Sequence, residues 1–184
     1  ISTIDKLIIC LICIVISIIS SYKILIVPNL EGTDVFSWGV TFAEVLFSCA
    51  FLILFSKKEN PTINSRQILL IISLLFIVQV IKISFGSGLS PLSIIVPPSL
   101  IISQGMGTII ALAWVSVASL SWPDSIIEIN SNLLLITLIC ACIVSVLGGK
   151  IRSRAQLLQL SIFVPIGAFL GQWIFIGNNK TSLI

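Results

Sequence analysis

Histidine is absent from this sequence. Imidazole is a common metal ligand and the usual base beside a serine or cysteine nucleophile, so its absence excludes imidazole metal sites, His-ligated haem and nucleophile–histidine catalysis. The aspartates Asp5, Asp34 and Asp124 lie only near the ends of apolar segments, so they cannot form a protease pair inside a membrane. The single carboxylate found deep in an apolar segment has no second catalytic group beside it. We therefore predict no enzyme activity and no metal site, and the sequence indicates no particular cofactor.

Charged residues are also scarce. They form 9% of the 184 residues, against about 25% in ordinary globular domains. Hydrophobic residues form 57%, which is more apolar surface than one soluble core of this length could bury. Several apolar runs reach the roughly 20 residues that cross a bilayer. The sequence therefore predicts an all-α fold, namely a polytopic membrane helix bundle with about six transmembrane helices and short loops.

The basic residues of this chain are not gathered on one face. The formal net charge is +3, and the lysines and arginines are scattered among the loops. Because nucleic-acid binding requires a basic patch or stripe, we predict no nucleic-acid partner. The expected partners are the lipid bilayer and, in a larger complex, other membrane subunits.

The predicted helices form a single integral-membrane domain over residues 1–184. They cover about residues 7–27, 35–55, 68–85, 98–122, 133–149 and 157–177. The first segment is too long for the core of a signal peptide, and no small-x-small cleavage pattern follows it. We therefore interpret it as a retained helix.

The orientation of the bundle follows from the basic residues in its short loops. Lys57, Lys58 and Arg66 lie in or next to the loop that follows the second predicted helix, whereas the preceding loop carries Glu31 and Asp34. Short loops rich in lysine and arginine face the cytoplasm. The loop 56–67 is therefore predicted to be cytoplasmic.

The conformation of residues 92–122 decides whether the basic loop 150–154 also lies on the cytoplasmic side. Strict alternation of six helices would place the basic loop 150–154 outside, against the charge rule. A re-entrant or broken hairpin within 92–122 would remove this conflict, and Pro97-Pro98 and Gly105-Met106-Gly107 are plausible break points. A single helix over 98–122, with Pro98 at its first position, is the main prediction because re-entrant segments are exceptional.

Glu44 is the only charged residue in the predicted helix 35–55. A charge at this depth costs about 2.5–3.5 kcal/mol on insertion scales and usually faces a bundle interior or a polar cavity. Ser37, Thr41, Glu44 and Ser48 follow the spacing i, i+4, i+7, i+11, so they share one helix face. This stripe predicts a substrate- or ion-binding site. In the alternative interpretation, the hydroxyls bond their own backbone and Glu44 is a neutral acid tied to a neighbouring helix.

Lys82 and Gln79, near the end of the predicted helix 68–85, complete the candidate site. If this helix is antiparallel to the preceding one, the stem of Lys82 could approach Glu44, with Gln79 at an intermediate level. In the alternative interpretation, Lys82 extends outward to the headgroup region.

Gly167 and Gly171 form a G-x-x-x-G pattern in the last predicted helix. Such a pattern allows close approach of another helix, so it predicts a packing contact within or between subunits.

These features support two functional hypotheses. The first is a transport or small-solute-binding membrane component that uses the buried carboxylate. The alternative is a non-catalytic accessory subunit or assembly factor of a larger membrane complex. Glu44 discriminates between them, because the first hypothesis requires it to line a cavity and the second allows it to pack against a neighbour.

Overall fold

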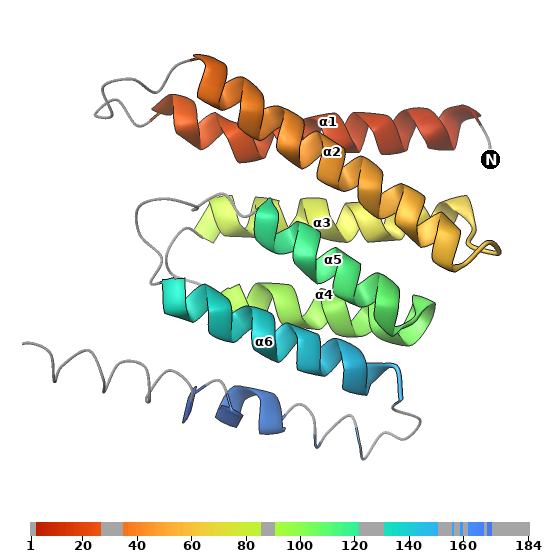
Figure 1. Cartoon of the computed structure of the whole chain (residues 1–184), viewed down its shortest axis with the longest axis vertical. Helices are drawn as coiled ribbons and strands as arrows, with labels where there is room; N and C mark the ends of the chain where they lie inside the picture. Colours follow the sequence, from red (N-terminus) through yellow and green to blue (C-terminus); the bar gives the residue numbers. More distant parts are fainter. Residues whose placement is uncertain are drawn as a thin grey trace, which may run out of the picture. The chain divides into compact units, whose positions relative to one another are not determined.

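A computed structural model describes residues 3–26, 35–85, 91–121 and 131–150, together with residues 156, 159, 162–167, 169 and 170. Within residues 3–150 of the described chain lie six helices (Figure 1): α1 Thr3–Ile26, α2 Val35–Glu59, α3 Ser65–Phe85, α4 Pro91–Met106, α5 Thr108–Leu120 and α6 Ser131–Gly148. The described residues contain no strand. The prediction of an all-α fold is therefore confirmed.

The contacts of the chain divide it into two units. Unit 1 comprises Ile1–Leu89 and Ser116–Pro123, and unit 2 comprises Ser90–Val115 and Asp124–Ile184. In unit 1, α1 packs against α2 and α3, and α2 also touches α3; in unit 2, α4 packs against α6. The fully buried Ile16, Leu52 and Ile72 give one core residue from each of the three helices of unit 1.

Helices α1, α2 and α3 are long and apolar enough to cross a membrane, through Ile4–Ser21, Trp38–Glu59 and Ser65–Lys82.

Hydrogen bonds in the turn between α2 and α3 explain where α3 begins. The side chain of Asn60 accepts hydrogen bonds from the amide (3.3 Å) and hydroxyl (2.7 Å) of Thr62. The amide of Asn64 then donates to Gln67 Oε1 at 2.9 Å, as in a capping box. This cap starts α3 at Ser65, three residues before the predicted start.

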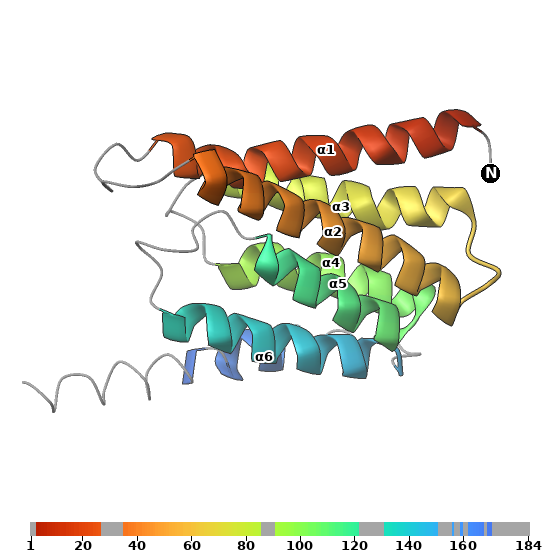
Figure 2. The ribbon, with the colours of Figure 1, turned by 45° about the horizontal axis from the view of Figure 1, so that its top comes forward.

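The prediction of a single helix over residues 98–122 is wrong, and the alternative of a broken segment is confirmed. Two helices, α4 and α5, flank Gly107, which has a φ of 109°, a conformation that residues with a side chain rarely adopt. The Gly107 amide donates to the Ser103 carbonyl and its carbonyl accepts from the Ala111 amide, both at 3.2 Å, so one helix ends where the next begins. Figures 1 and 2 show the chain reversing at this point.

Pro97 and Pro98 do not interrupt the helix, because both lie inside α4. This helix begins at Pro91 rather than at Pro98. Helix α4 has 16 residues and α5 has 13, so they are about 24 Å and 20 Å long at about 1.5 Å per residue. Both are shorter than the three candidate spans of unit 1.

A close helix contact exists in unit 2, and it does not involve Gly167. Gly167 is exposed, and an added Cβ there would meet no atom within 4 Å. Gly171, and with it the end of the predicted helix 157–177, lies outside the described residues. Gly167 therefore makes no tight contact within the described chain, while a contact between subunits stays a prediction.

The close contact lies instead at the C-terminal end of α6. An added Cβ at Gly148 would lie 3.2 Å from Ser103 Oγ, and one at Gly149 would overlap Cγ2 of Thr108. The Ser103 hydroxyl also donates to the Ser145 carbonyl. The two glycines thus let α6 approach the turn between α4 and α5.

Candidate functional site

Gln79 and Lys82 lie one turn apart on α3 and are only 1% and 3% exposed. The spacing i, i+3 puts both on one face of the helix, near its C-terminal end. The alternative in which Lys82 extends outward is therefore wrong. Figures 1 and 2 show that the C-terminal ends of α1 and α3 lie at the same end of unit 1, so both helices can contribute to a site there.

The amide of Gln79 connects three segments of unit 1. Its Nε2 donates to Ser20 Oγ on α1 at 2.7 Å and to the carbonyl of Ser121, just after α5, at 3.0 Å. The Ser20 hydroxyl in turn reaches the carbonyls of Ile16 (3.0 Å) and Ser121 (3.2 Å). Carbonyls at the end of a helix lack intrahelical donors, and Gln79 and Ser20 supply them to Ser121.

The other half of the same amide has no partner. Gln79 Oε1 is buried and makes no hydrogen bond in the structure. Exchanging the amide oxygen and nitrogen would not remove the problem, because the oxygen would then face the Ser121 carbonyl, which only accepts. A buried acceptor without a donor costs about 1–3 kcal/mol. The cluster therefore presents a buried acceptor that a donor group could satisfy.

Two further serines of α1 are buried on the same helix face as Ser20. Ser17 and Ser21 are fully buried, and their hydroxyls donate to the carbonyls of Cys13 (2.9 Å) and Ser17 (2.8 Å). Together with Ser20 they have the spacing i, i+3, i+4, so they form one helix face. We call Ser17, Ser20, Ser21, Gln79, Lys82 and Ser121 the polar cluster. Its serines were not selected from the sequence, although the spacing of the three on α1 was an available signal.

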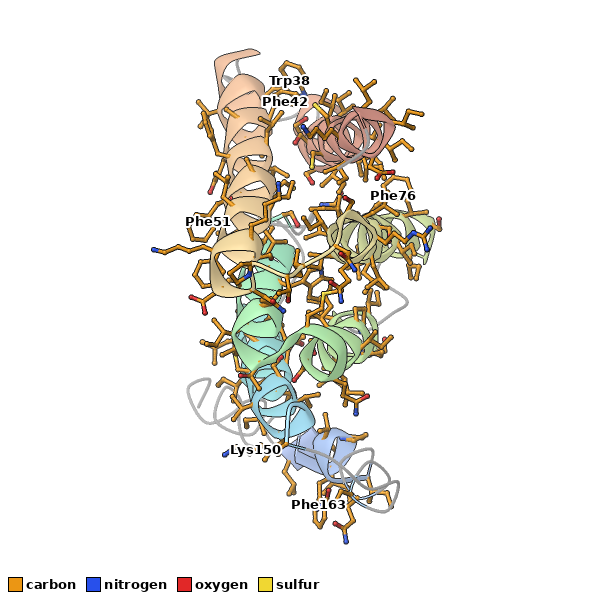
Figure 3. The ribbon with its side chains drawn as sticks, turned by 90° about the vertical axis from the view of Figure 1, so that its right-hand side faces the viewer. Trp38, Phe42, Phe51, Phe76, Lys150 and Phe163 are labelled. Carbon is orange, nitrogen blue, oxygen red and sulfur yellow. The ribbon has the colours of Figure 1, made fainter. Side chains whose placement is uncertain are left out.

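The stripe predicted on α2 faces away from the interior. Glu44 is exposed and Thr41 and Ser48 are half-buried, while the side chain of Ser37 lies outside the described residues. The expectation that Glu44 faces the bundle interior is therefore wrong. Figure 3 shows Phe51 on the outer side of α2, where it is 59% exposed.

The reason lies in a second stripe on the same helix. The buried face of α2 consists of four residues with the same spacing: Val45, Cys49, Leu52 and Ser56, each at most 2% exposed. Glu44 precedes Val45 by one residue and so points about 100° away from this face. Packing the mostly apolar stripe against α1 turns the carboxylate outward. Glu44 is exposed, whereas Lys82 is buried. The fold therefore does not bring these two residues together.

The polar cluster brings several kinds of hydrogen-bonding group into one buried region of unit 1. It combines an amide acceptor, an ammonium group one turn away and several hydroxyls, all in a buried setting where hydrogen bonds are stronger than in water. In the part of the chain that the structure describes, no three histidine, cysteine, aspartate or glutamate side chains gather in a way that could hold a metal ion.

Comparison with known proteins identifies the family. The family model described as "7TM receptor with intracellular HD hydrolase" matches residues 35–182, which is most of the 184-residue chain. The chain therefore belongs to this family, and the prediction of a multi-pass integral membrane protein in a lipid bilayer is confirmed. No curated protein and no solved structure matches the chain.

Proposed function

We propose that this chain, as a member of the 7TM receptor family with an intracellular HD hydrolase, is a receptor membrane domain that binds a small polar solute at the polar cluster. Binding there would change the packing of α1 and α3 against the end of α5. The altered packing would in turn regulate an intracellular HD hydrolase. The hydrolase domain would catalyse the reaction, and the membrane helices would transmit the effect of solute binding to it.

The observation that supports this proposal most is the unpartnered Gln79 Oε1. A solute with a hydroxyl or ammonium donor would satisfy it, and the bonds that Nε2 makes to Ser20 and Ser121 would adjust to the new donor. A carboxylate on the same solute would be favoured by the ammonium of Lys82. The proposed ligands are therefore small hydroxylated, amine-bearing or zwitterionic molecules.

We further propose that the loop 56–67 faces the cytoplasm, which would put the polar cluster near the opposite surface. The motivation is the group of Lys57, Lys58 and Arg66. The cluster lies at the C-terminal ends of α1 and α3, whereas this loop joins α2 to the N-terminal end of α3. A solute would then reach the cluster from outside the cell, as a receptor requires.

The break at Gly107 supports this orientation. Whether α4 and α5 form a re-entrant hairpin or two crossings, the chain returns to the side from which it entered. After one further crossing by α6, the basic loop 150–154 would lie on the same side as the loop 56–67. The conflict with the charge rule then disappears.

Transport and an accessory-subunit role stay predictions. Transport depended on Glu44 lining an interior cavity, and Glu44 is exposed. Solute binding is retained from that hypothesis but is assigned to the polar cluster.

Thermal unfolding of the purified chain in lipid nanodiscs tests the proposal. Polyols, small primary amines and zwitterionic amino acids should be compared on wild type, Gln79→Leu and the matched control Glu44→Gln. At least one of the three classes should raise the Tm of wild type and Glu44→Gln by several degrees and leave Gln79→Leu unchanged. The same solute should not cross the membrane of proteoliposomes that contain the chain. If none of the three classes shifts the Tm, or if Gln79→Leu responds like wild type, the proposal is wrong; solute flux would favour transport.

A further inference from the structure

A groove of about 260 Å³ opens in unit 1 at the end opposite the polar cluster. Its walls come from α1, α2 and α3 and are almost entirely apolar: Ile9, Cys13, Leu46, Ala50, Ile53 and Ile68. Because the three helices are candidate membrane spans, these walls lie at the depth of the hydrocarbon region. An occupant of this part must therefore be apolar.

The outer end of the groove has the opposite character. Lys6, Lys57 and Ser65 line it, and both lysine side chains are exposed. Ser65 is the first residue of α3, so the groove ends at a helix N-terminus, where the helix dipole favours an anion. Asp5 precedes Lys6, but its carboxylate does not line the groove. An occupant should therefore carry negative charge at this end.

The length of the groove agrees with one membrane leaflet. From Lys57 to Leu46 the groove follows α2 for eleven residues, or about 16 Å at about 1.5 Å per residue. This distance is about half of the roughly 30 Å hydrocarbon core of a bilayer. The groove thus runs from headgroup level to the depth that the acyl chain of one leaflet reaches.

We propose that this groove binds an anionic phospholipid of the leaflet next to the loop 56–67. The phosphate lies between Lys6 and Lys57 at the N-terminus of α3, and one acyl chain follows the apolar wall toward Leu46. A lipid is the occupant with charge and hydrocarbon at these two positions, and it enters sideways from the bilayer. The proposal does not depend on the role assigned to the polar cluster.

The neighbouring Lys58 provides a matched control. It carries the same charge as Lys57 and is also exposed, but it does not line the groove. Lys6→Gln/Lys57→Gln and Lys58→Gln can therefore separate a specific site from general attraction between basic residues and an anionic surface. Ala50→Leu adds volume to the groove wall and tests the acyl-chain part without altering charge.

The experiment measures binding of a photoreactive phosphatidylglycerol to the full chain in phosphatidylcholine nanodiscs, with cross-links mapped by mass spectrometry. Wild type should be cross-linked on the groove residues of α1, α2 or α3. The double variant should lose at least about tenfold in apparent affinity, because each lysine near an anionic surface contributes roughly fivefold. Ala50→Leu should also bind less, whereas Lys58→Gln should change less than about fivefold. Helicity and Tm confirm that each variant is folded.

Three outcomes would overturn the proposal. An effect of Lys58→Gln equal to that of the double variant would indicate only general charge attraction. Equal cross-linking by a photoreactive phosphatidylcholine would remove the anionic specificity. Full competition by inorganic phosphate would indicate an anion site that does not use the acyl chain.

Discussion

The two units hold their helices together by different means. In unit 1 the amide of Gln79 reaches across to Ser20 and to the carbonyl of Ser121, so the junction consists of side-chain hydrogen bonds. In unit 2 the missing side chains of Gly148 and Gly149 let α6 approach the turn between α4 and α5. The first junction consists of groups that another polar molecule could replace, whereas the second depends on close backbone approach.

This difference indicates where the protein can respond to a ligand. A hydrogen-bonded junction with an unpartnered acceptor can take up the donor of a ligand at small cost. A glycine contact has no comparable alternative, because close-packed interiors resist changes of volume. We therefore expect unit 1 to adjust its packing and unit 2 to stay fixed.

Truncating the side chain of Gln79 in unit 1 should have the largest effect. Gln79→Ala should lower the free energy of unfolding by about 3 kcal/mol, because it leaves a cavity and removes two interhelical bonds. Gln79→Leu keeps most of the volume and removes the unpartnered oxygen, so it should lie within about 1 kcal/mol of wild type. Unfolding by SDS in mixed micelles measures both. Equal losses for the two variants would mean that hydrogen bonding rather than packing dominates this junction.

Filling the glycine contact of unit 2 should have the next largest effect. Gly149→Leu should cost about 2 kcal/mol, because its side chain overlaps Thr108. Gly105→Leu is the matched control, since a Cβ at Gly105 meets nothing within 4 Å. The control should be neutral or slightly stabilising, because leucine favours a helix more than glycine does. The same SDS titration measures both variants. Similar losses of unfolding free energy for the two would show that the close approach at Gly149 does not limit the size of its side chain.

The hydroxyl bond of unit 2 should contribute much less than its glycines. Ser103→Ala removes the donor to the Ser145 carbonyl and should cost about 0.6 kcal/mol, the average for such bonds between membrane helices. Ser119→Ala is its control, because that hydroxyl only bonds the carbonyl of Ser116 in its own helix. The same titration measures both variants. If Ser103→Ala lost more unfolding free energy than Gly149→Leu, the hydrogen bond and not the glycine contact would dominate this junction.

The exposed carboxylate of unit 1 should have the smallest effect. Glu44→Gln should change the free energy of unfolding by less than about 0.5 kcal/mol, because surface substitutions away from packed features rarely do more. Thermal unfolding in nanodiscs provides the measurement. A clear destabilisation would show that Glu44 contacts another copy of the chain or a partner subunit.

The sequence was sufficient to predict the helices of unit 1, because their apolar runs are long and uninterrupted. It also identified Gln79 and Lys82, since polar residues near the end of such a run are conspicuous. It could not decide which face of α2 is buried: the polar stripe through Glu44 and the buried stripe through Val45 have the same spacing. Only the packing partner selects between them, and the apolar contact with α1 prevails.

The break in the segment 92–122 was harder to locate. Two prolines suggested a break or a helix start at Pro98, yet membrane helices tolerate proline, and α4 contains both. The decisive residue was Gly107, whose positive φ is a property of the folded backbone and not of the local pattern. Ser20 of α1 was missed for a related reason, because its partners Gln79 and Ser121 lie far away in sequence.

Gly107 also has a consequence for how the protein is inserted into its membrane during synthesis. A residue with a Cβ at this position would favour one continuous helix of 30 residues from Pro91 to Leu120, about 45 Å long, which would cross the membrane once. The helices that follow would then cross in the opposite direction, and the basic loop 150–154 would lie on the side opposite to the one proposed for it. In the proposed orientation, the glycine and that loop would act as two independent signals for one topology. A chain that lost both would insert as a mixture of two topologies.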